Sequence, residues 1–333
     1  MTVRQFVLGG LLLLVASPVS AAGTDVENFY RNKTMTFLVS GDVGTGYDLN
    51  ARLVARHMEK YLPGTRIVIQ NITGAGGIVA ANRIYVTRPE GLLLGIINTG
   101  LVYSQLLGLE GVRFDLRQMQ WIGKSEADPR VLYTSAATGI GSLEALLAHE
   151  GRVLFVATTG AGSAANNEAL LIGRILKLQL EMVTFNNSNE GNLSMMRGEV
   201  HGRVGSYSTA KRFVSGSEGI LLASVGRADQ IQEDLPDLND FVSDVTDRQI
   251  LRLIETVSRF GRFVVMPPGE DPAKVNYLRE AYRQTLADPE FLREARNLGL
   301  DIAPMSGAEL AEEIAEVLDQ PPAVIELLKS VSN

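Results

Sequence analysis

The sequence predicts an α/β fold with mostly parallel sheets, and two observations carry that prediction. Short apolar runs alternate with amphipathic helical patterns over most of the chain, and glycine-rich segments stand between a run and the helix that follows it. Alternating strands and helices are typical of parallel sheets covered by helices. The chain has 333 residues and no cysteine, so we expect a large core rather than disulfides to stabilise the fold.

The first 22 residues are expected to be a secretory signal peptide that lies outside the fold. Arg4 gives it a positive start, "FVLGGLLLLVA" is an apolar stretch, and "SPVSAAG" offers small residues for cleavage after Ala21 or Ala22. At roughly 11 residues the apolar stretch is too short to span a bilayer, although an uncleaved anchor is the alternative. The segment therefore predicts export to the periplasm.

The charge of the mature chain excludes some partners. Without Arg4 the 31 basic residues become 30 against 38 acidic ones, a net charge of −8. This balance argues against nucleic acid and against an anionic membrane surface. No later stretch approaches 18 consecutive apolar residues, so we expect the mature protein to be soluble.

The strand candidates are short apolar runs, which lie at 35–39, 66–70, 92–97, 131–134, 153–157, 180–185, 201–205, 219–225 and 262–266. Helical patterns lie between them, as at 49–62 and 164–178, where apolar residues recur every three or four positions. We find no linker of low complexity and no internal repeat. Two lobes would therefore require the chain to cross between them, and the candidate crossings are 123–130 and 223–228.

The last third of the chain is predicted to be helical from its capping signals. Asp271 and Asp288 are each followed by proline, which combines an N-cap with a residue suited to the first turn. Ser306 and Glu309 match a capping box. These features predict structure and carry no function.

Three glycine-rich segments share one design, in which a strand is followed by small residues and then by a helix start. They lie at 40–48, 73–77 and 159–163. Each places free backbone N–H groups and the positive end of a helix at the carboxyl edge of a sheet. Such edges bind ligands in open α/β sheets. The segments therefore predict a shared anion pocket, whereas the alternative for each one is a tight turn with an ordinary N-cap.

Nucleotide binding is disfavoured by the same segments. Gly41 and Gly46 have the spacing of a phosphate-binding loop, but Tyr47 and Asp48 replace the required Lys-Ser/Thr pair. The run from Gly160 to Ala165 matches G-x-G-x-x-A, yet the next suitable acidic residue falls near the start of a strand rather than its end. A secretory signal also argues against a dinucleotide ligand.

Catalytic residues, cofactors and metals are not expected. No G-x-S-x-G elbow occurs, and the three histidines, His57, His149 and His201, are not spaced with other ligands as in a metal site. A cysteine nucleophile is excluded by composition. The chain is therefore predicted to be a binding protein and not an enzyme.

Four stretches give a resemblance to a known family: "GTGYDLNARLVARHM", "VIQNITGAGGIVAAN", "RPEGLLLGIINTG" and "TTGAGSAANNEAL". In order and spacing they resemble the periplasmic solute receptors of tripartite tricarboxylate transporters, the Bug or TctC family. The resemblance covers nearly the whole mature chain, and the "QN…GAGG…AAN" stretch is its most specific part.

The resemblance implies a fold of the periplasmic-binding-protein type (type II-like), with a ligand cleft between two lobes. One lobe would combine 23–125 with 226–333, and the other would be 126–225. The family binds small organic acids, often dicarboxylates or aromatic acids, through loop amides, hydroxyls and ordered waters. A receptor of this kind is expected to be a monomer that delivers its solute to a two-subunit membrane permease.

The resemblance also implies ligand-binding residues on each glycine-rich segment. The first segment would contribute Gly44, Thr45, Gly46 and Asp48, and the second Gly74, Ala75, Gly76 and Gly77. The third, from the other lobe, would contribute Thr159, Gly160, Gly162 and Ser163. Asn186, Asn187 and Ser188 stand where the family usually has Y-x-G, and Tyr47 is expected to stack on the ligand or gate it. Asp42 could repel an anion or recognise an amine.

Two other functions stay open at this point. A sensory module that presents its ligand to a membrane signalling protein would have the same fold and pocket. An exported enzyme of unrecognised type is disfavoured because the chain shows neither nucleophile nor general base. Arg52 and Arg56, on the helix after the first segment, are expected to face solvent or a partner rather than the cleft.

Overall fold

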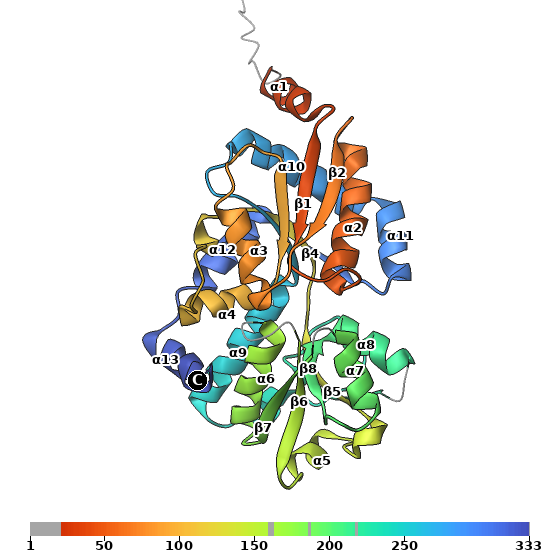
Figure 1. Cartoon of the computed structure of the whole chain (residues 1–333), viewed down its shortest axis with the longest axis vertical. Coiled ribbons are helices and arrows are strands. Elements are labelled where there is room, and N and C mark those ends of the chain that lie inside the picture. The colour runs from red at the N-terminus through yellow and green to blue at the C-terminus, as the bar shows by residue number, and fades with distance from the viewer. Residues whose placement is uncertain (1–20, 159–162, 186–187, 217–218, 333) are drawn as a thin grey trace, which may run out of the picture.

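The computed structural model describes residues 21–158, 163–185, 188–216 and 219–332. Its strands form two groups, one in the upper and one in the lower half of Figure 1, and helices surround both. The α/β class with two lobes that the sequence predicts is therefore confirmed. Within the described ranges, no helix combines the length and the apolar character needed to cross a membrane.

The upper group is a six-stranded sheet with the strand order β11-β4-β10-β3-β1-β2. Its strands are β1 (Thr34–Val39), β2 (Arg66–Asn71), β3 (Leu93–Ile97), β4 (Gln120–Glu126), β10 (Arg262–Met266) and β11 (Ile302–Ser306). Strand β1 pairs in parallel with both β2 and β3. The pairs of β10 with β3, β10 with β4 and β11 with β4 are antiparallel. Strands β1, β2 and β3 therefore end at the same edge of the sheet.

The lower group consists of two small sheets. Strands β5 (Arg130–Ser135), β8 (Arg203–Ser206) and β9 (Gly219–Val225) are antiparallel, with β5 in the centre. Strands β6 (Arg152–Thr158) and β7 (Gln179–Phe185) are parallel. A parallel bridge between Phe155 and Gly202 joins β6 to the segment that leads into β8. Because β6 and β8 run in the same direction, their carboxyl ends also point the same way.

Alternation along the strands explains how the helices cover the upper sheet. Phe37 and Val39 pack into a cluster with α2 and α10, whereas Leu38 between them packs into a cluster with α3, α4 and α12. The helices associated with this sheet are α1 (Ala21–Tyr30), α2 (Gly46–Met58), α3 (Ile78–Tyr85), α4 (Gly100–Leu107), α10 (Pro272–Ala287), α11 (Pro289–Asn297) and α12 (Gly307–Val317). Each face of the sheet is thus buried by its own set of helices.

The remaining helices lie around the lower group or beside it (Figure 1). They are α5 (Leu143–Leu147), α6 (Ala164–Ile175), α7 (Ser188–Met196), α8 (Tyr207–Gly216), α9 (Val245–Phe260) and α13 (Pro322–Ser332). Short 3₁₀ turns are η1 (Glu59–Tyr61), η2 (Ala75–Gly77), η3 (Leu116–Gln118), η4 (Ala136–Thr138) and η5 (Leu238–Phe241). Helix α9 contacts β5 and β9 of the lower group and also α12 of the upper one.

The chain passes between the groups at two places that touch each other. The first is the segment between β4 and β5, and the second is the junction of α9 with β10 at Gly261. The amide of Asp128 in the first crossing donates a hydrogen bond to the carbonyl of Ser258 in α9, over 2.9 Å. The segment 223–228, which the sequence predicts as a crossing, contains the end of β9. The chain enters the upper sheet only after α9.

Most local sequence predictions are confirmed. Each strand candidate overlaps an observed strand, and the two Asp-Pro starts and the Ser306–Glu309 capping box cap α10, α11 and α12. Strands β4 and β11 were not predicted. The first has polar residues at its carboxyl end, and the second is an edge strand that contains Pro304, a residue that disfavours central strands.

Candidate functional site

A cavity of about 140 Å³ lies where the carboxyl ends of β1, β2 and β3 meet those of β6 and β8. Its wall is formed by the segments that follow these strands and by residues from the two crossings. The lining residues are Ser40, Gly41, Asp42, Thr45, Gly46, Tyr47, Thr73, Gly74, Gly76, Gly77, Asn98, Asp128, Arg130, Ser163, Ala164, Ala165, Arg203, Gly205, Ser206, Thr209 and Arg262. All three glycine-rich segments therefore contribute to one cavity.

The first segment reaches the cavity through Thr45, Gly46 and Tyr47, at the start of α2. Gly44 has a φ of +82°, a left-handed conformation that favours glycine, but it does not line the cavity. Its amide donates to the carboxylate of Asp48 over 2.8 Å. This bond closes the loop and fixes the direction in which α2 begins.

Asp48 is buried and does not line the cavity. Its carboxylate also accepts from Arg52 Nε, at 2.9 Å, and from Asn71 Nδ2, at 3.0 Å. Burial alone would raise the pKa of Asp48, but the hydrogen bonds from Arg52, Gly44 and Asn71 hold it below its usual value. The geometry gives Asp48 a role in shaping the first segment rather than a direct contact with a ligand.

The second segment presents Thr73, Gly74, Gly76 and Gly77 to the cavity, whereas Ala75 does not line it. The three glycines have φ values of +121°, +63° and +100°, so the backbone turns through conformations that side chains rarely allow. A Cβ atom on Gly77 would lie 3.5 Å from Ser40 Oγ. The absence of side chains thus brings the end of β1 and the start of α3 together.

The third segment is described from Ser163 onward, because Thr159, Gly160 and Gly162 lie outside the described residues. Ser163 is buried, lines the cavity and caps α6, since its hydroxyl accepts from the amide of Asn166 over 3.3 Å. Because the oxygen accepts this bond, the O–H proton of Ser163 can be donated to another acceptor. Asn186 and Asn187 are also outside the described residues, and Ser188 begins α7.

A fourth segment of the same kind was missed by the sequence analysis. Gly205, Ser206 and Thr209 line the cavity at the junction of β8 with α8. The sequence there, "GSYST", has small and hydroxyl residues between a strand and a helix. The strand predicted at 201–205 includes Gly205, so the sequence pattern does not mark this glycine as part of a loop. Asn98, just after β3, also lines the cavity and was not predicted, because it stands in a short Asn-Thr-Gly segment rather than in a glycine-rich one.

The largest difference from the sequence prediction is a group of buried charges in the wall. Asp128, in the first crossing, accepts hydrogen bonds from Arg130 Nη1 at 2.6 Å and from Arg262 Nη1 at 2.9 Å. Glu168 of α6 accepts from Arg130 Nε, and Thr99 Oγ1 accepts from Arg130 Nη2 at 3.1 Å. Burial opposes the charge of Asp128, but Arg262 and Arg130 keep its pKa below the usual value.

Ser40 and Arg262 each give the wall a donor that has no partner among the described residues. Ser40 Oγ and Arg262 Nε are both shielded from solvent and make no hydrogen bond there. Buried polar groups are normally paired, so unpaired ones call for an explanation such as a ligand or an ordered water. The charged lining residues are Arg130, Arg203 and Arg262 against Asp42 and Asp128, so the wall is not acidic although the chain carries a net charge of −7.

Tyr47 packs against Arg262 of this charge group. The guanidinium carbon of Arg262 lies 4.1 Å from the centroid of the Tyr47 ring, which is a cation–π distance. The Tyr47 hydroxyl accepts from the amide of Thr99 over 3.4 Å. The ring is therefore held between the start of α4 and the second crossing, with one face covered by Arg262.

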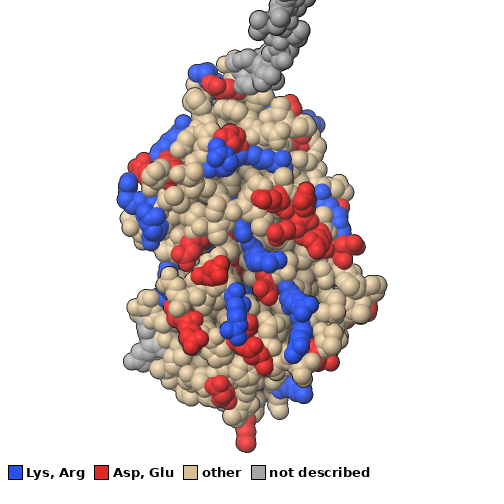
Figure 2. Space-filling model, turned by 180° about the vertical axis from the view of Figure 1, so that it is seen from behind, with Lys and Arg blue, Asp and Glu red and all other residues tan. Residues whose placement is uncertain are grey.

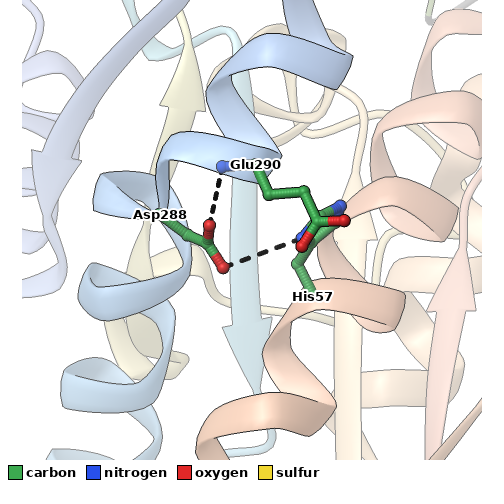
Figure 3. Close-up of side chains that lie close together, drawn as sticks. All are labelled: His57, Asp288 and Glu290. Carbon is green, nitrogen blue, oxygen red and sulfur yellow. Dashed lines mark hydrogen bonds and ion pairs between the residues drawn. The ribbon is translucent and has the colours of Figure 1, made fainter.

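A separate cluster of His57, Asp288 and Glu290 ties α2 to α11, outside the cavity lining (Figure 3). Within the described residues it is the group that could offer three ligands to a metal ion. Lys60 Nζ already lies 3.0 Å from Asp288 Oδ2 and 2.6 Å from Glu290 Oε2. The ammonium group compensates both carboxylates, so the cluster is an ion-pair contact between helices.

The face of the molecule seen in Figure 2, from behind, carries both acidic and basic side chains in each half, and acidic side chains gather on the right of the upper half. Arg52 and Arg56 are about half exposed or more, and each pairs with a carboxylate, Asp48 and Glu294 respectively. Neither arginine lines the cavity.

Two α/β lobes with a polar cavity where their helix starts converge define a solute-binding protein of the periplasmic type. Residues 50–329 match the family described as tripartite tricarboxylate transporter family receptor, TctC, and the chain belongs to that family. It is accordingly a receptor and not an enzyme.

Individual relatives are distant in sequence but similar over nearly their whole length. The UPF0065 protein in the tcbD-tcbE intergenic region of Pseudomonas sp. strain P51 is 21% identical over 306 residues, which cover 90% of this chain and 87% of that protein. The periplasmic binding protein BugD has a TM-score of 0.73 at 17% identity, over 91% of this chain and 98% of BugD. MatC from Rhodopseudomonas palustris with bound malate has a TM-score of 0.70 at 19% identity, over 90% and 99%.

Proposed function

We propose that the protein is a periplasmic receptor that captures a small organic acid, a dicarboxylate or an aromatic acid, and delivers it to a membrane permease. The observation that carries the proposal is the convergence of the starts of α2, α3 and α6 on one cavity, with glycines and hydroxyls facing it. A helix start favours negative charge because its first N–H groups are unpaired. The malate bound to the similarly folded MatC supports an acid as the ligand.

The energy available at such a site is sufficient for capture. A hydrogen bond to a charged group contributes about 1.5–3 kcal/mol, and a dissociation constant near 1 μM needs about 8 kcal/mol beyond the cost of association. Several amides, together with the hydroxyls of Ser40 and Ser163, can supply this amount if they close on one carboxylate. The donors come from both strand groups, so closure of the lobes would complete the site.

We assign the ligand contacts to the predicted residues that line the cavity and treat the others as support. The contacts are Thr45, Gly46, Tyr47, Gly74, Gly76, Gly77 and Ser163. Gly44, Asp48 and Ala75 shape the segments that carry them. The predicted residues at 159, 160, 162 and 186–188 remain candidates for the side of the site that belongs to β6 and β7.

We further propose the lobe boundaries 23–125 with 226–333 for one lobe and 126–225 for the other. The two strand groups fit this division. Helix α9 belongs to the first lobe by sequence but contacts β5 and β9 of the second, so it would form the connection on which the lobes move. Export through residues 1–22 and a monomeric state complete the proposal.

A thermal-shift screen of the chain purified from the periplasm tests the function. The probes are malate, succinate, aspartate, adipate and benzoate, each at millimolar concentration, with glucose and lysine as controls of other chemistry. We expect at least one acid to raise the melting temperature and to bind with a stoichiometry of one by calorimetry. Chromatography of the incubated acid should show no product. Stabilisation by none of the acids, or conversion of the bound one, would contradict the proposal.

A further inference from the structure

We infer that Arg262 binds the anionic group of the ligand directly and sets the selectivity of the site for charged over neutral ligands. The inference rests on the proposed function and adds a specificity-determining residue to it. Neither the glycine-rich segments nor the family resemblance points to this arginine, which stands at the first position of β10. Its place in the cavity wall comes from the fold alone.

Arg262 keeps donors that no described residue uses. Its bond from Nη1 to Asp128 is the one hydrogen bond that its side chain makes within the described ranges. Nε is buried and has no hydrogen-bond partner among the described residues. Nη2 lies beside Gly46, since a Cβ atom built on that glycine would be 2.8 Å from it. The unused side of the guanidinium therefore faces the start of α2, where the helix dipole also favours an anion.

Arg130 shows what a purely structural arginine looks like in the same wall. It is equally buried, but each of its three nitrogens donates to a described partner: Nε to Glu168, Nη1 to Asp128 and Nη2 to Thr99. Burial of a guanidinium is tolerated when its donors are satisfied in this way. Arg262 shares Asp128 with Arg130 and has no second carboxylate bonded to it among the described residues, which leaves it available to a ligand carboxylate.

The position of Arg262 is fixed before any ligand arrives. Tyr47 covers one face of the guanidinium at 4.1 Å, and Asp128 holds one end of it. A fixed planar fork matches a carboxylate with two parallel hydrogen bonds and loses little entropy on binding. Gly46 permits this arrangement because any side chain there would meet Nη2.

The test compares an acid with its neutral amide. Binding of malate and benzoate, and of malamide and benzamide, is measured by calorimetry for the native protein and for Arg262→Gln and Arg262→Lys. We expect Arg262→Gln to weaken the acid that binds by about ten- to hundredfold, the range of a charge-assisted hydrogen bond, and to change the amide by less than about threefold. Arg262→Lys should fall between the two.

Two further variants separate a ligand contact from a structural effect. Lys211→Gln removes one positive charge from α8 outside the cavity lining and should leave the preference for the acid unchanged. Gly46→Ala retains the charge but pushes Nη2 away, so it should weaken the acid more than the amide. If Arg262→Gln does not fold, Gly46→Ala still tests whether Arg262 contacts the acid.

The outcomes distinguish this inference from the function on which it rests. Equal weakening of acid and amide by the Arg262 variants would show a structural role and overturn the inference, as would unchanged binding of the acid. In both cases the receptor function would stand. If no acid in the panel stabilises the native protein, the proposed function fails and the inference fails with it.

Discussion

Gly261 lies directly against the backbone of Glu126, so that a Cβ atom on Gly261 would be 1.8 Å from the Glu126 carbonyl oxygen. Its φ of +51° and ψ of −117° are accessible to glycine alone. The contact joins the two places where the chain passes between the strand groups. A glycine is therefore required at the point on which movement of the lobes would depend.

Replacing Gly261 by alanine should destabilise the protein by more than about 3 kcal/mol, because overpacking against rigid backbone adds to the conformational cost. Gly299→Ala is the matched control: that glycine also has a positive φ, of +67°, but nothing lies within 4 Å of the added Cβ. It should cost only about 1 kcal/mol. Urea unfolding measures both, and equal losses would show that the Glu126 contact is unimportant.

Glu126 itself should make stability depend on pH. Burial raises the pKa of this carboxyl from 4.5 to about 7, despite the nearby charge of Arg262 and a hydrogen bond from Asn50. The folded state thus holds a proton that the unfolded state releases above about pH 4.5. The contribution of Glu126 to stability is largest below pH 4.5, declines as the pH rises through 7 and is lost above it.

Glu126→Gln removes that proton equilibrium and can still accept the bond from Asn50. Relative to the native protein, the variant should gain about 2.5 kcal/mol in free energy of unfolding between pH 5 and pH 8, which is most of the effect of a pKa raised from 4.5 to about 7. Other titrating groups are the same in both proteins and cancel in the difference. A difference that does not change with pH would mean that Glu126 is ionised in the fold at neutral pH.

Ser163 should matter to the ligand beyond its effect on the helix. Ser163→Ala removes the N-cap of α6 and a hydroxyl donor from the cavity, whereas Ser142→Ala removes the N-cap of α5 outside the cavity lining. Both should lower stability by about 1 kcal/mol. Only Ser163→Ala should reduce the thermal shift caused by the bound acid. A bulky Ser163→Leu should abolish that shift, and an unchanged one would remove Ser163 from the site.

The sequence predicted the parts of the site that are encoded locally. A strand, a run of glycines and a capped helix start are visible in a few adjacent residues, and the segments with Thr45, Gly77 and Ser163 all reach the cavity. The same reading could have found Ser206 and Thr209. The sequence alone predicts Asp48 as a ligand contact, because it does not distinguish a polar residue that faces the cavity from one that closes its own loop at a helix start.

The charged part of the wall could not be predicted in this way. Asp128, Arg130 and Arg262 line the cavity, and Glu168 pairs with Arg130 outside the lining. These residues are separated by up to 134 positions, and each one taken alone is typical of an ordinary surface charge. Only the fold shows that they are buried together. The two missed strands have a similar cause, because β4 and β11 are defined by their pairing and not by an apolar pattern of their own.

The pair of Arg130 and Glu168, which lies within the proposed 126–225 lobe, tests how much a buried ion pair contributes to the stability of the fold. Arg130 is in β5, and Glu168 is in α6, whose other neighbours include α4 and α13. Removing one partner of a buried pair leaves an uncompensated charge, so Arg130→Met should lower the free energy of unfolding by about 3–5 kcal/mol. Burial already raises the pKa of Glu168 against the effect of Arg130, so the unpaired carboxyl should take up a proton and soften the loss at acidic pH.

The double variant Arg130→Met with Glu168→Leu removes both charges and should recover part of that stability, because two apolar side chains need no partner. Urea unfolding of the two single variants and the double variant at pH 8 gives the coupling between them. A sum of the single losses equal to the loss in the double variant would show that the residues do not act as a pair. A double variant at least as stable as the native protein would show that the buried pair is costly to the fold.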